Sequence, residues 1–325
     1  MNDLRKESVT FVTIGEDSEG QRLDNFLLKQ LKGVPKSHVY RVLRRGEVRV
    51  NGKRAAPTYR MAVGDVLRLP PVRTAQLERP AAAAAPVAPR LAQSVLYEDD
   101  ALLVVNKPAG MAVHGGSGIS RGVIEQLRLE RPELKFIELV HRLDRETSGV
   151  LLLAKKRSAL TALHRAMREG EMDKRYLALV KGQWKNTRQN VKFPLHKYLT
   201  AEGERRVSVS DEGKAAHTVF MLRRAWKEFS LLEAELKTGR THQIRVHLAH
   251  LGFPIAGDDK YGDFALNKEL QRRGLKRMFL HAYRVIIRHP ATGEPLGLEA
   301  PLPTELDDFL RRLDREGEPR SGAGD

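Results

Sequence analysis

The sequence contains no cysteine, and this absence excludes several kinds of site at once. Disulfides, iron–sulfur clusters, cysteine-ligated zinc and cysteine nucleophiles all need the missing thiol. Long apolar runs are also missing, because the longest have only about six residues and a bilayer-spanning helix needs about twenty. The first residues show no apolar stretch typical of a secretion signal. We therefore expect a soluble, cytoplasmic protein.

Positive charge is what the sequence has in excess. Its 325 residues include 57 Lys and Arg against 41 Asp and Glu, which gives a net charge of +16. A basic chain attracts polyanions, so nucleic acid is the expected partner. No P-loop, dinucleotide-binding glycine motif or nucleophile elbow is present, and we expect no organic cofactor.

An Ala- and Pro-rich stretch divides the chain in two. Residues 76–93 include five consecutive alanines between prolines, a composition that favours an extended linker. The linker separates a small piece, 14–75, from a large piece, 94–313. We expect residues 1–13 to be a loose terminus and 314–325 to be a disordered tail.

The small piece is the more basic of the two. Between Gln21 and Pro70, twelve Lys and Arg stand against three Asp and Glu. Apolar spacing predicts two helices, and Asn51-Gly52 predicts a hairpin turn. This pattern, with RLDNFL, PKSHVYRVLRRGEVRVNGK and VGDVLRLP, resembles the S4 RNA-binding domain. The resemblance implies phosphate contacts, which position RNA without reading its sequence. The residues singled out for these contacts are Lys36, Arg41, Arg44, Arg45 and Lys53.

The large piece alternates strand-like and helix-like segments. Residues 95–105 read as a hairpin, and helices are expected after Ser158 and over 241–251. Many strands with few, separated helices predict an α+β domain with a mixed, mainly antiparallel sheet. The other expected strands are 149–154, 176–180, 218–222, 229–236 and 283–287.

The segment VHRLDRETSGV, residues 140–150, carries the clearest candidate for chemistry. It is polar and charged but opens directly into an apolar strand. A side chain at the end of a buried strand is held by the scaffold and reachable from a cleft. Asp144 stands between Arg142 and Arg145, whose positive charges favour an ionised carboxylate. Such an aspartate can act as a nucleophile or a base, although the spacing alone also fits a salt-bridged loop.

A second polar segment, 238–248, raises the question of a metal. His242, His247 and His250 are close in sequence, but His242 and His247 are five residues apart with no carboxylate between them. A zincin helix has two histidines at i and i+4 with an intervening glutamate. We therefore predict no metal and interpret the segment as a basic helix with capping and packing histidines.

Four segments, taken in chain order, resemble the RluA family of pseudouridine synthases. They are VVNKPAG at 104–110, HRLDRETSGVLLLAKK at 141–156, KRYLA at 174–178 and GRTHQIRVHL at 239–248. The order of S4-like domain, linker and catalytic domain fits as well. The resemblance implies an isomerase that turns uridines of bacterial 23S, large-subunit ribosomal RNA into pseudouridine without a cofactor.

The resemblance also implies roles for individual residues. Asp144 matches the catalytic aspartate and Arg245 the arginine that pairs with it. Arg142 matches the arginine that helps displace or replace the flipped uridine, and Tyr176 the tyrosine that stacks on the target base. In the reaction the C1′–N1 bond breaks, the base turns, and C1′ bonds to C5. An ionised Asp144 could attack C1′ or remove the C2′ proton, and the sequence leaves both open.

Two other functions compete with this interpretation. A glycosidase or nucleosidase usually needs two carboxylates, and Glu146 is the nearby candidate for the second. A non-catalytic RNA-binding factor would depend on the basic small piece alone. For the synthase, the expected partner is large-subunit ribosomal RNA, free or within an assembly intermediate, with no membrane and no protein partner.

Overall fold

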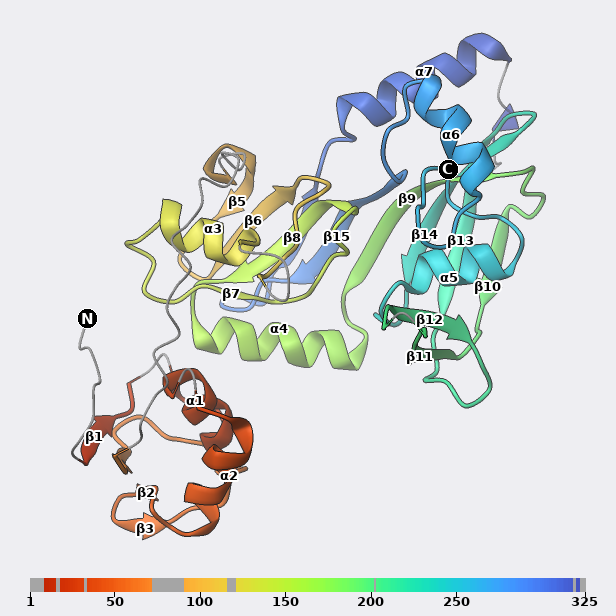
Figure 1. Cartoon of the computed structure of the whole chain (residues 1–325). Coiled ribbons are helices and arrows are strands. Elements are labelled where there is room, and N and C mark those ends of the chain that lie inside the picture. The colour runs from red at the N-terminus through yellow and green to blue at the C-terminus, as the bar shows by residue number, and fades with distance from the viewer. Residues whose placement is uncertain are drawn as a thin grey trace. The chain divides into compact units, whose positions relative to one another are not determined.

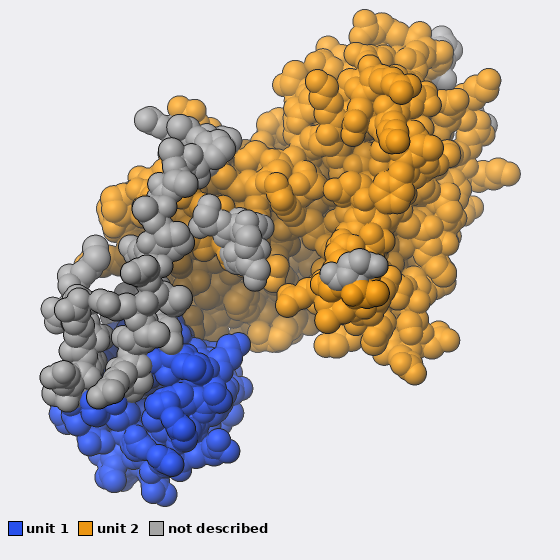
Figure 2. Space-filling view, viewed as in Figure 1, with its two compact units in different colours: residues 1–89 blue, residues 90–325 orange. Residues whose placement is uncertain are grey.

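A computed structural model of the chain describes residues 9–15, 18–31, 34–71, 91–115, 121–201, 203–317 and 320–321. The chain divides into two compact units, residues 1–89 and 90–325 (Figures 1 and 2). Most of the predicted linker lies outside the described residues. Each unit is described by itself.

Unit 1 packs two helices against a four-stranded antiparallel sheet of order β1-β4-β2-β3. Both predicted helices are present, and Val39, Val42 and Leu43 of the second helix are buried in the core of unit 1. The hairpin turn is confirmed, because Asn51 and Gly52 have φ of 50° and 77°. The elements are β1 (Thr10–Thr13), α1 (Leu23–Gln30), α2 (Lys36–Arg44), β2 (Arg49–Val50), β3 (Lys53–Arg54) and β4 (Val66–Leu69).

The expectation of a loose terminus is wrong for residues 10–13. They form β1, which pairs with β4 in the register Thr10 with Leu69. The pairing covers backbone groups of β4 that would otherwise stand at an open sheet edge. Ile14, which follows β1, is buried in the core of unit 1.

Unit 2 is built on one large sheet, in which β15 and β8 are parallel and the other pairs antiparallel. This confirms the expected mixed, mainly antiparallel α+β fold. Its main path is β10-β13-β14-β9-β15-β8-β6-β5, with β16, β17 and β7 at the side of β15, β13 and β8. The strands of the main path are β5 (Val95–Glu98), β6 (Leu102–Lys107), β8 (Ser148–Ala154), β9 (Asp173–Lys181), β10 (Arg188–Val191), β13 (Thr218–Ala225), β14 (Phe229–Leu236) and β15 (Leu280–Arg288).

The remaining elements cover the sheet or extend it (Figure 1). β11 and β12 form a separate two-stranded hairpin. The helices are α3 (Val123–Glu130), α4 (Arg157–Glu169), α5 (Gln243–His250), α6 (Phe264–Arg272) and α7 (Thr304–Glu316). The other strands are β7 (Glu138–Leu139), β11 (Leu195–Leu199), β12 (Arg205–Val209), β16 (Pro295–Glu299) and β17 (Arg320–Ser321).

Apolar side chains from the two faces of the sheet enter different cores. Tyr176, Ala178 and Leu232 pack with α3 and α5 in one core. On the other face, α4 packs over β6 and β8, and α6 and α7 pack over β9 and β14. Successive strand residues point to opposite faces, so this division follows from the period of two. It places α5 and Tyr176 of β9 in the same core.

The first residues of β8 pack tightly against β15. Gly149 has φ +112°, and a Cβ atom there would lie 2.1 Å from the carbonyl oxygen of Ala282 in β15. Only glycine fits this approach. Next to it, the Ser148 hydroxyl lies 2.8 Å from His281 Nδ1 and accepts a hydrogen bond from Arg277 at 2.8 Å. These contacts fix the position of the residues at which the loop before β8 ends.

Two expected boundaries of the large piece are wrong. The chain is already folded at Leu91–Ser94, a 3₁₀ turn whose Leu91 is buried and whose first backbone N–H groups bond to Glu130. At the other end α7 continues to Glu316 because Leu313 is buried and Asp314 accepts from Arg224 and Trp226. Beyond α7, β17 pairs with β13. Among the described helices, none has the length and apolar character needed to cross a membrane.

Candidate active site

Asp144 lies in the loop between β7 and β8, and its side chain is 25% exposed. The loop rests on Lys107, the fully buried last residue of β6. The Lys107 ammonium donates to the carbonyl oxygens of Arg145 at 3.0 Å, Pro108 at 2.7 Å and Met111 at 2.8 Å. Burial lowers the pKa of Lys107 to about 7, and its three carbonyl acceptors match the three hydrogens of an ammonium.

Arg245 of α5 reaches the Asp144 carboxylate from the other side of the site. Its Nη1 donates to Asp144 Oδ2 at 3.2 Å, and the residue is only 5% exposed. A guanidinium buried this deeply needs more than one contact with a half-exposed carboxylate. Its second partner is Asp258, which follows α5 in the chain.

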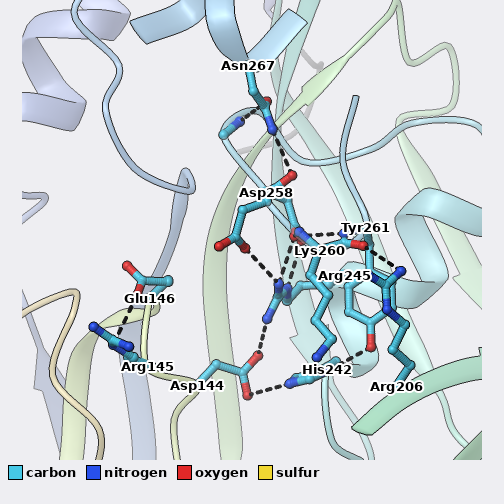
Figure 3. A network of polar contacts seen from close by, with 12 residues as sticks. Asp144, Arg145, Glu146, Arg206, His242, Arg245, Asp258, Lys260, Tyr261 and Asn267 are labelled. Carbon is cyan, nitrogen blue, oxygen red and sulfur yellow. Dashed lines mark hydrogen bonds and ion pairs between the residues drawn. The ribbon is translucent and has the colours of Figure 1, made fainter. Parts of the chain in front are cut away.

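Asp258 holds Arg245 in a two-pronged ion pair (Figure 3). Its two carboxylate oxygens accept from Arg245 Nε and Nη2, each at 2.7 Å. One of them also accepts the backbone N–H groups of Lys260 and Tyr261. Burial alone would raise the pKa of Asp258, but Arg245 and these N–H donors together hold it below its usual value. The Arg245 guanidinium is therefore fixed in orientation before any substrate arrives.

His242 is the third group beside Asp144, and its Nε2 lies 3.8 Å from Asp144 Oδ1. Its Nδ1 lies 2.8 Å from the Tyr261 hydroxyl, which accepts the backbone N–H of Val207 in β12 at 3.0 Å. The hydroxyl hydrogen is therefore available to His242 Nδ1, and the ring hydrogen is assigned to Nε2, facing Asp144. Burial lowers the pKa of His242, so the ring is neutral at pH 7.

Tyr176 and Arg142 differ in how firmly the fold holds them. Tyr176 is 7% exposed, and burial together with the negative charge of Asp144 raises its pKa, so its phenol stays protonated. Arg142 is exposed, and within the described part of the chain its guanidinium makes no hydrogen bond or ion pair. The structure thus gathers Asp144, Arg245 and Tyr176 and leaves Arg142 free to move at the edge.

Glu146, the second carboxylate considered from the sequence, lies apart from the Asp144 carboxylate (Figure 3). It pairs with Arg145 at 3.4 Å, and its backbone carbonyl accepts from Arg277. The carboxylates of Asp258 and Asp259 both face Arg245. Glu146, Asp258 and Asp259 thus each have a cationic partner, and this arrangement gives no support to the two-carboxylate site of a glycosidase.

The histidines of the second polar segment have separate structural surroundings. His247 is fully buried, with Nδ1 3.0 Å from the Thr218 hydroxyl and Nε2 3.0 Å from the Phe193 carbonyl oxygen. His242 precedes α5 with φ 54°, in the left-handed region. Among the described residues, no three His, Asp or Glu side chains are grouped so that they could hold a metal ion.

Unit 1 presents the basic residues that were singled out for RNA contact. All of them are exposed on α2, just after it, or on β3. Arg45 comes within 3.8 Å of Glu47, which leaves most of the positive charge of this surface unbalanced. The residues are Lys36, Arg41, Arg44, Arg45 and Lys53.

Sequence reasoning missed three residues of the network. Lys107 lies within a segment that was noted for its resemblance, but a buried lysine carries no signal of its own in a sequence. Asp258 and Tyr261 belong to the polar stretch GDDKYG, which directly follows the apolar residues 253–256. That abrupt change from apolar to acidic residues was the available signal.

Comparisons with known proteins match two parts of the chain to families. The family described as RNA pseudouridylate synthase matches residues 101–250, and the S4 domain family matches residues 21–67. Two solved human structures share the fold of unit 2. RNA Pseudouridylate Synthase Domain Containing 4 has a TM-score of 0.57 and 27% identity, covering 69% of this chain and 94% of its own. Domain Containing 1 has a TM-score of 0.56 and 28% identity, covering 70% and 89%.

Curated relatives match almost the whole chain, and the following examples carry the name ribosomal large subunit pseudouridine synthase C. The protein from Yersinia pestis is 54% identical over 306 residues, which is 94% of this chain and 96% of that protein. The protein from Pasteurella multocida is 51% identical, covering 94% of each chain. The protein from Escherichia coli K12 is 53% identical, covering 94% of this chain and 97% of its own.

Proposed function

The chain belongs to the RNA pseudouridine synthase family, and from this membership we propose that it isomerises uridines of large-subunit ribosomal RNA to pseudouridine with Asp144 as the reacting carboxylate. The names of its relatives supply the class of RNA. The observation that carries the role of Asp144 is its geometry. It is a partly exposed carboxylate held by Arg245, which Asp258 fixes from behind.

The reaction rearranges one nucleoside and needs no oxidant, water or cofactor. The C1′–N1 bond breaks, the detached base turns, C5 bonds to C1′, the proton on C5 is lost, and N1 takes up a proton, so the product is an isomer of uridine. Asp144 in its ionised form either attacks C1′ or removes the C2′ proton. Both routes start from the same carboxylate, and Arg245 favours its ionised state.

Asp258 allows Arg245 to stay in position beside Asp144 throughout the reaction. In either route the negative charge of Asp144 is consumed for part of the cycle, by an ester bond or by a proton. A buried guanidinium with no other partner would then be strongly destabilised. Because Asp258 balances its charge, Arg245 remains in place while Asp144 reacts, and no side chain has to rearrange.

The remaining groups around Asp144 act on the base. The target must leave its stack, at a cost of a few kcal/mol. Tyr176 offers a buried ring on which the base can stack, and Arg142 is free to enter the space that the base leaves. The Nε2–H of His242 faces the reacting carboxylate and can donate to the carboxylate or to the substrate beside it.

Unit 1 supplies a second, sequence-independent contact with the RNA. Its exposed lysines and arginines suit phosphate binding and would hold folded RNA near the catalytic unit. We place the reaction in the cytoplasm, on ribosomal RNA that is either free or part of an assembling subunit. Offering both substrates to the enzyme distinguishes them.

Tritium release from a large-subunit rRNA transcript labelled at uridine C5 tests the proposal. We expect release by the wild type and by Asp211→Asn, an exposed aspartate outside the site. We expect no release by Asp144→Asn, with RNA binding retained. Turnover by purified Asp144→Asn would remove Asp144 from the reaction. Free uracil among the wild-type products would indicate hydrolysis instead.

A further inference from the structure

A groove next to the catalytic loop is not used by the reaction described above. It encloses about 330 Å³ between α6 and the loops that carry Glu146 and Asp259. We call it the α6 groove. Its lining includes Glu146, Asp259, Phe264, Lys268, Gln271 and Lys276. A volume of this order is at the lower end of the range for small-ligand sites.

The groove lies beside the active site. Glu146 is two residues from Asp144, and Asp259 Oδ1 lies 3.8 Å from Arg245 Nη2. A larger cavity of about 840 Å³ shares Glu146, Lys276 and Arg277 with it and continues toward the start of α7. Glu146 and Asp259 thus connect the lining of the groove with the surroundings of Asp144 and Arg245.

One side of α6 has the composition of a nucleotide-binding surface. Phe264, Lys268 and Gln271 are spaced i, i+4 and i+7 and all line the groove. Phe264 is 58% exposed and belongs to none of the apolar cores. The same helix packs on unit 2 through Leu266 and Leu270 instead. Phe264 is thus a large aromatic ring that the fold itself does not use.

The charges of the groove are arranged in two groups. Lys268 and Lys276 are exposed, and within the described residues neither forms a hydrogen bond or ion pair. Glu146 and Asp259 also line the groove, and so does Arg277, whose guanidinium donates to the backbone carbonyl oxygen of Glu146 at 3.2 Å. A phosphate is therefore attracted to Lys268 and Lys276, whereas amino groups of a base can donate to the carboxylates.

We propose that the α6 groove binds a nucleotide that neighbours the target uridine in the substrate strand. Its base stacks on Phe264, and its phosphates contact Lys268 and Lys276. An aromatic platform beside a cationic track is the combination that binds single-stranded nucleic acid. The inference rests on the proposed function, because it assigns the groove to the same RNA strand that reaches Asp144.

Replacing Phe264 tests the stacking contact. For Phe264→Ala we expect the KM and Kd of the large-subunit rRNA transcript to rise by roughly tenfold, with kcat unchanged. Phe264→Trp keeps a stacking ring and should restore wild-type binding. The matched control is Leu129→Ala, which removes an equally exposed apolar side chain (61%) from α3 and should change neither constant. A Phe264→Ala protein that binds like the wild type would overturn the proposal.

The lysines are tested through the salt dependence of binding. Two lost phosphate contacts should reduce the slope of log K against log salt concentration by about 1.4 for Lys268→Gln/Lys276→Gln. An unchanged slope would contradict the phosphate contacts. Filter binding measures both effects even if the wild type releases no tritium. In that case the proposed function fails, and a binding defect of Phe264→Ala would still assign the groove to RNA.

Discussion

At the scale of single residues, the site keeps several charged side chains together where little water reaches them. The Arg245 guanidinium donates hydrogen bonds to two carboxylates, and each carboxylate has a different role. Asp258 is buried and gives Arg245 permanent balance, whereas Asp144 is exposed enough to meet a ribose. An Arg245→Lys change would keep the positive charge but would lose the simultaneous hydrogen bonds to Asp258 and Asp144. An ammonium lacks the planar, forked set of N–H donors that a guanidinium has.

The Tyr261 hydroxyl donates to His242 Nδ1 and so keeps the ring hydrogen on Nε2. This gives a prediction for Tyr261→Phe. His242 Nδ1 loses its donor, so the neutral ring loses stabilisation and its pKa rises. We expect kcat to fall by about fivefold, the worth of one hydrogen bond, and the acidic limb of the kcat–pH profile to move to higher pH. KM for the transcript should not change.

A control tyrosine separates this effect from a general loss of packing. Tyr283 donates its hydroxyl hydrogen to the buried Glu233 at 2.7 Å, outside the site. Tyr283→Phe should lower stability without moving the pH profile. If Tyr261→Phe behaved in the same way, the hydroxyl would be structural and the assigned position of the ring hydrogen would be wrong.

Sequence reasoning reached these residues unevenly, for a physical reason. Asp144 and Arg245 belong to polar segments that adjoin apolar ones, and this contrast can be seen in the sequence itself. Lys107 and Asp258 act through contacts with residues 38 and 13 positions away. Their importance depends on which distant residues the fold brings next to them, and a local sequence pattern does not contain that information.

At the scale of elements, the catalytic loop depends on the strands at its end. Parallel pairing of β8 with β15 brings Ser148 beside His281, 133 residues later. Alternation and turn signals predicted the strands of the main path except β10, and they predicted the α+β class. They could not predict this pairing, because partners in a sheet are chosen by long-range packing rather than by neighbouring residues.

Gly149 provides the test at this scale. In Gly149→Ala the new Cβ meets the Ala282 carbonyl, and φ of +112° is itself unfavourable, so we expect a loss of at least about 3 kcal/mol in unfolding free energy. Urea denaturation measures it. Gly170→Ala is the control, because Gly170 has φ +77° but open space around it, and should cost only about 1 kcal/mol. Equal losses would refute the importance of the close approach.

His281 makes the stability of this region depend on pH. Burial lowers its pKa to about 4, while its Nε2 faces the Ala300 carbonyl oxygen. The unfolded chain therefore binds a proton that the folded chain does not, and stability falls as pH drops below about 6.5. Between pH 7 and pH 5 the contribution of His281 should fall by about 2 kcal/mol. Urea denaturation of the wild type and His281→Asn should show a shallower pH dependence for the variant.

At the scale of the whole molecule, we propose that unit 1 holds the RNA and that unit 2 carries out the reaction. Unit 1 has its own core and an exposed positive surface, and unit 2 contains Asp144 and the residues around it. The sequence showed this division through composition alone, since charge and the Ala/Pro stretch need no knowledge of contacts. It misjudged the edges, because residues 10–13 and 314–316 are ordered by partners far along the chain.

The basic surface of unit 1 is tested by Arg41→Gln/Arg44→Gln. We expect weaker binding of the rRNA transcript and a salt slope reduced by about one to two, because two phosphate contacts are lost. At saturating RNA, kcat should be unchanged. Lys185→Gln/Lys227→Gln, exposed on unit 2, removes the same charge and serves as the control. Identical slopes for both double variants would mean that only net charge matters.

The late position of the residues that support Asp144 has a consequence for the protein during its own synthesis. Asp144 leaves the ribosome a full 101 residues before Arg245, and the strand that fixes its loop follows later still. Unit 1, by contrast, has all its described strands and helices by residue 69. A chain still being translated therefore contains every described element of unit 1 before Arg245 and β15, which hold Asp144 and its loop, have been synthesised.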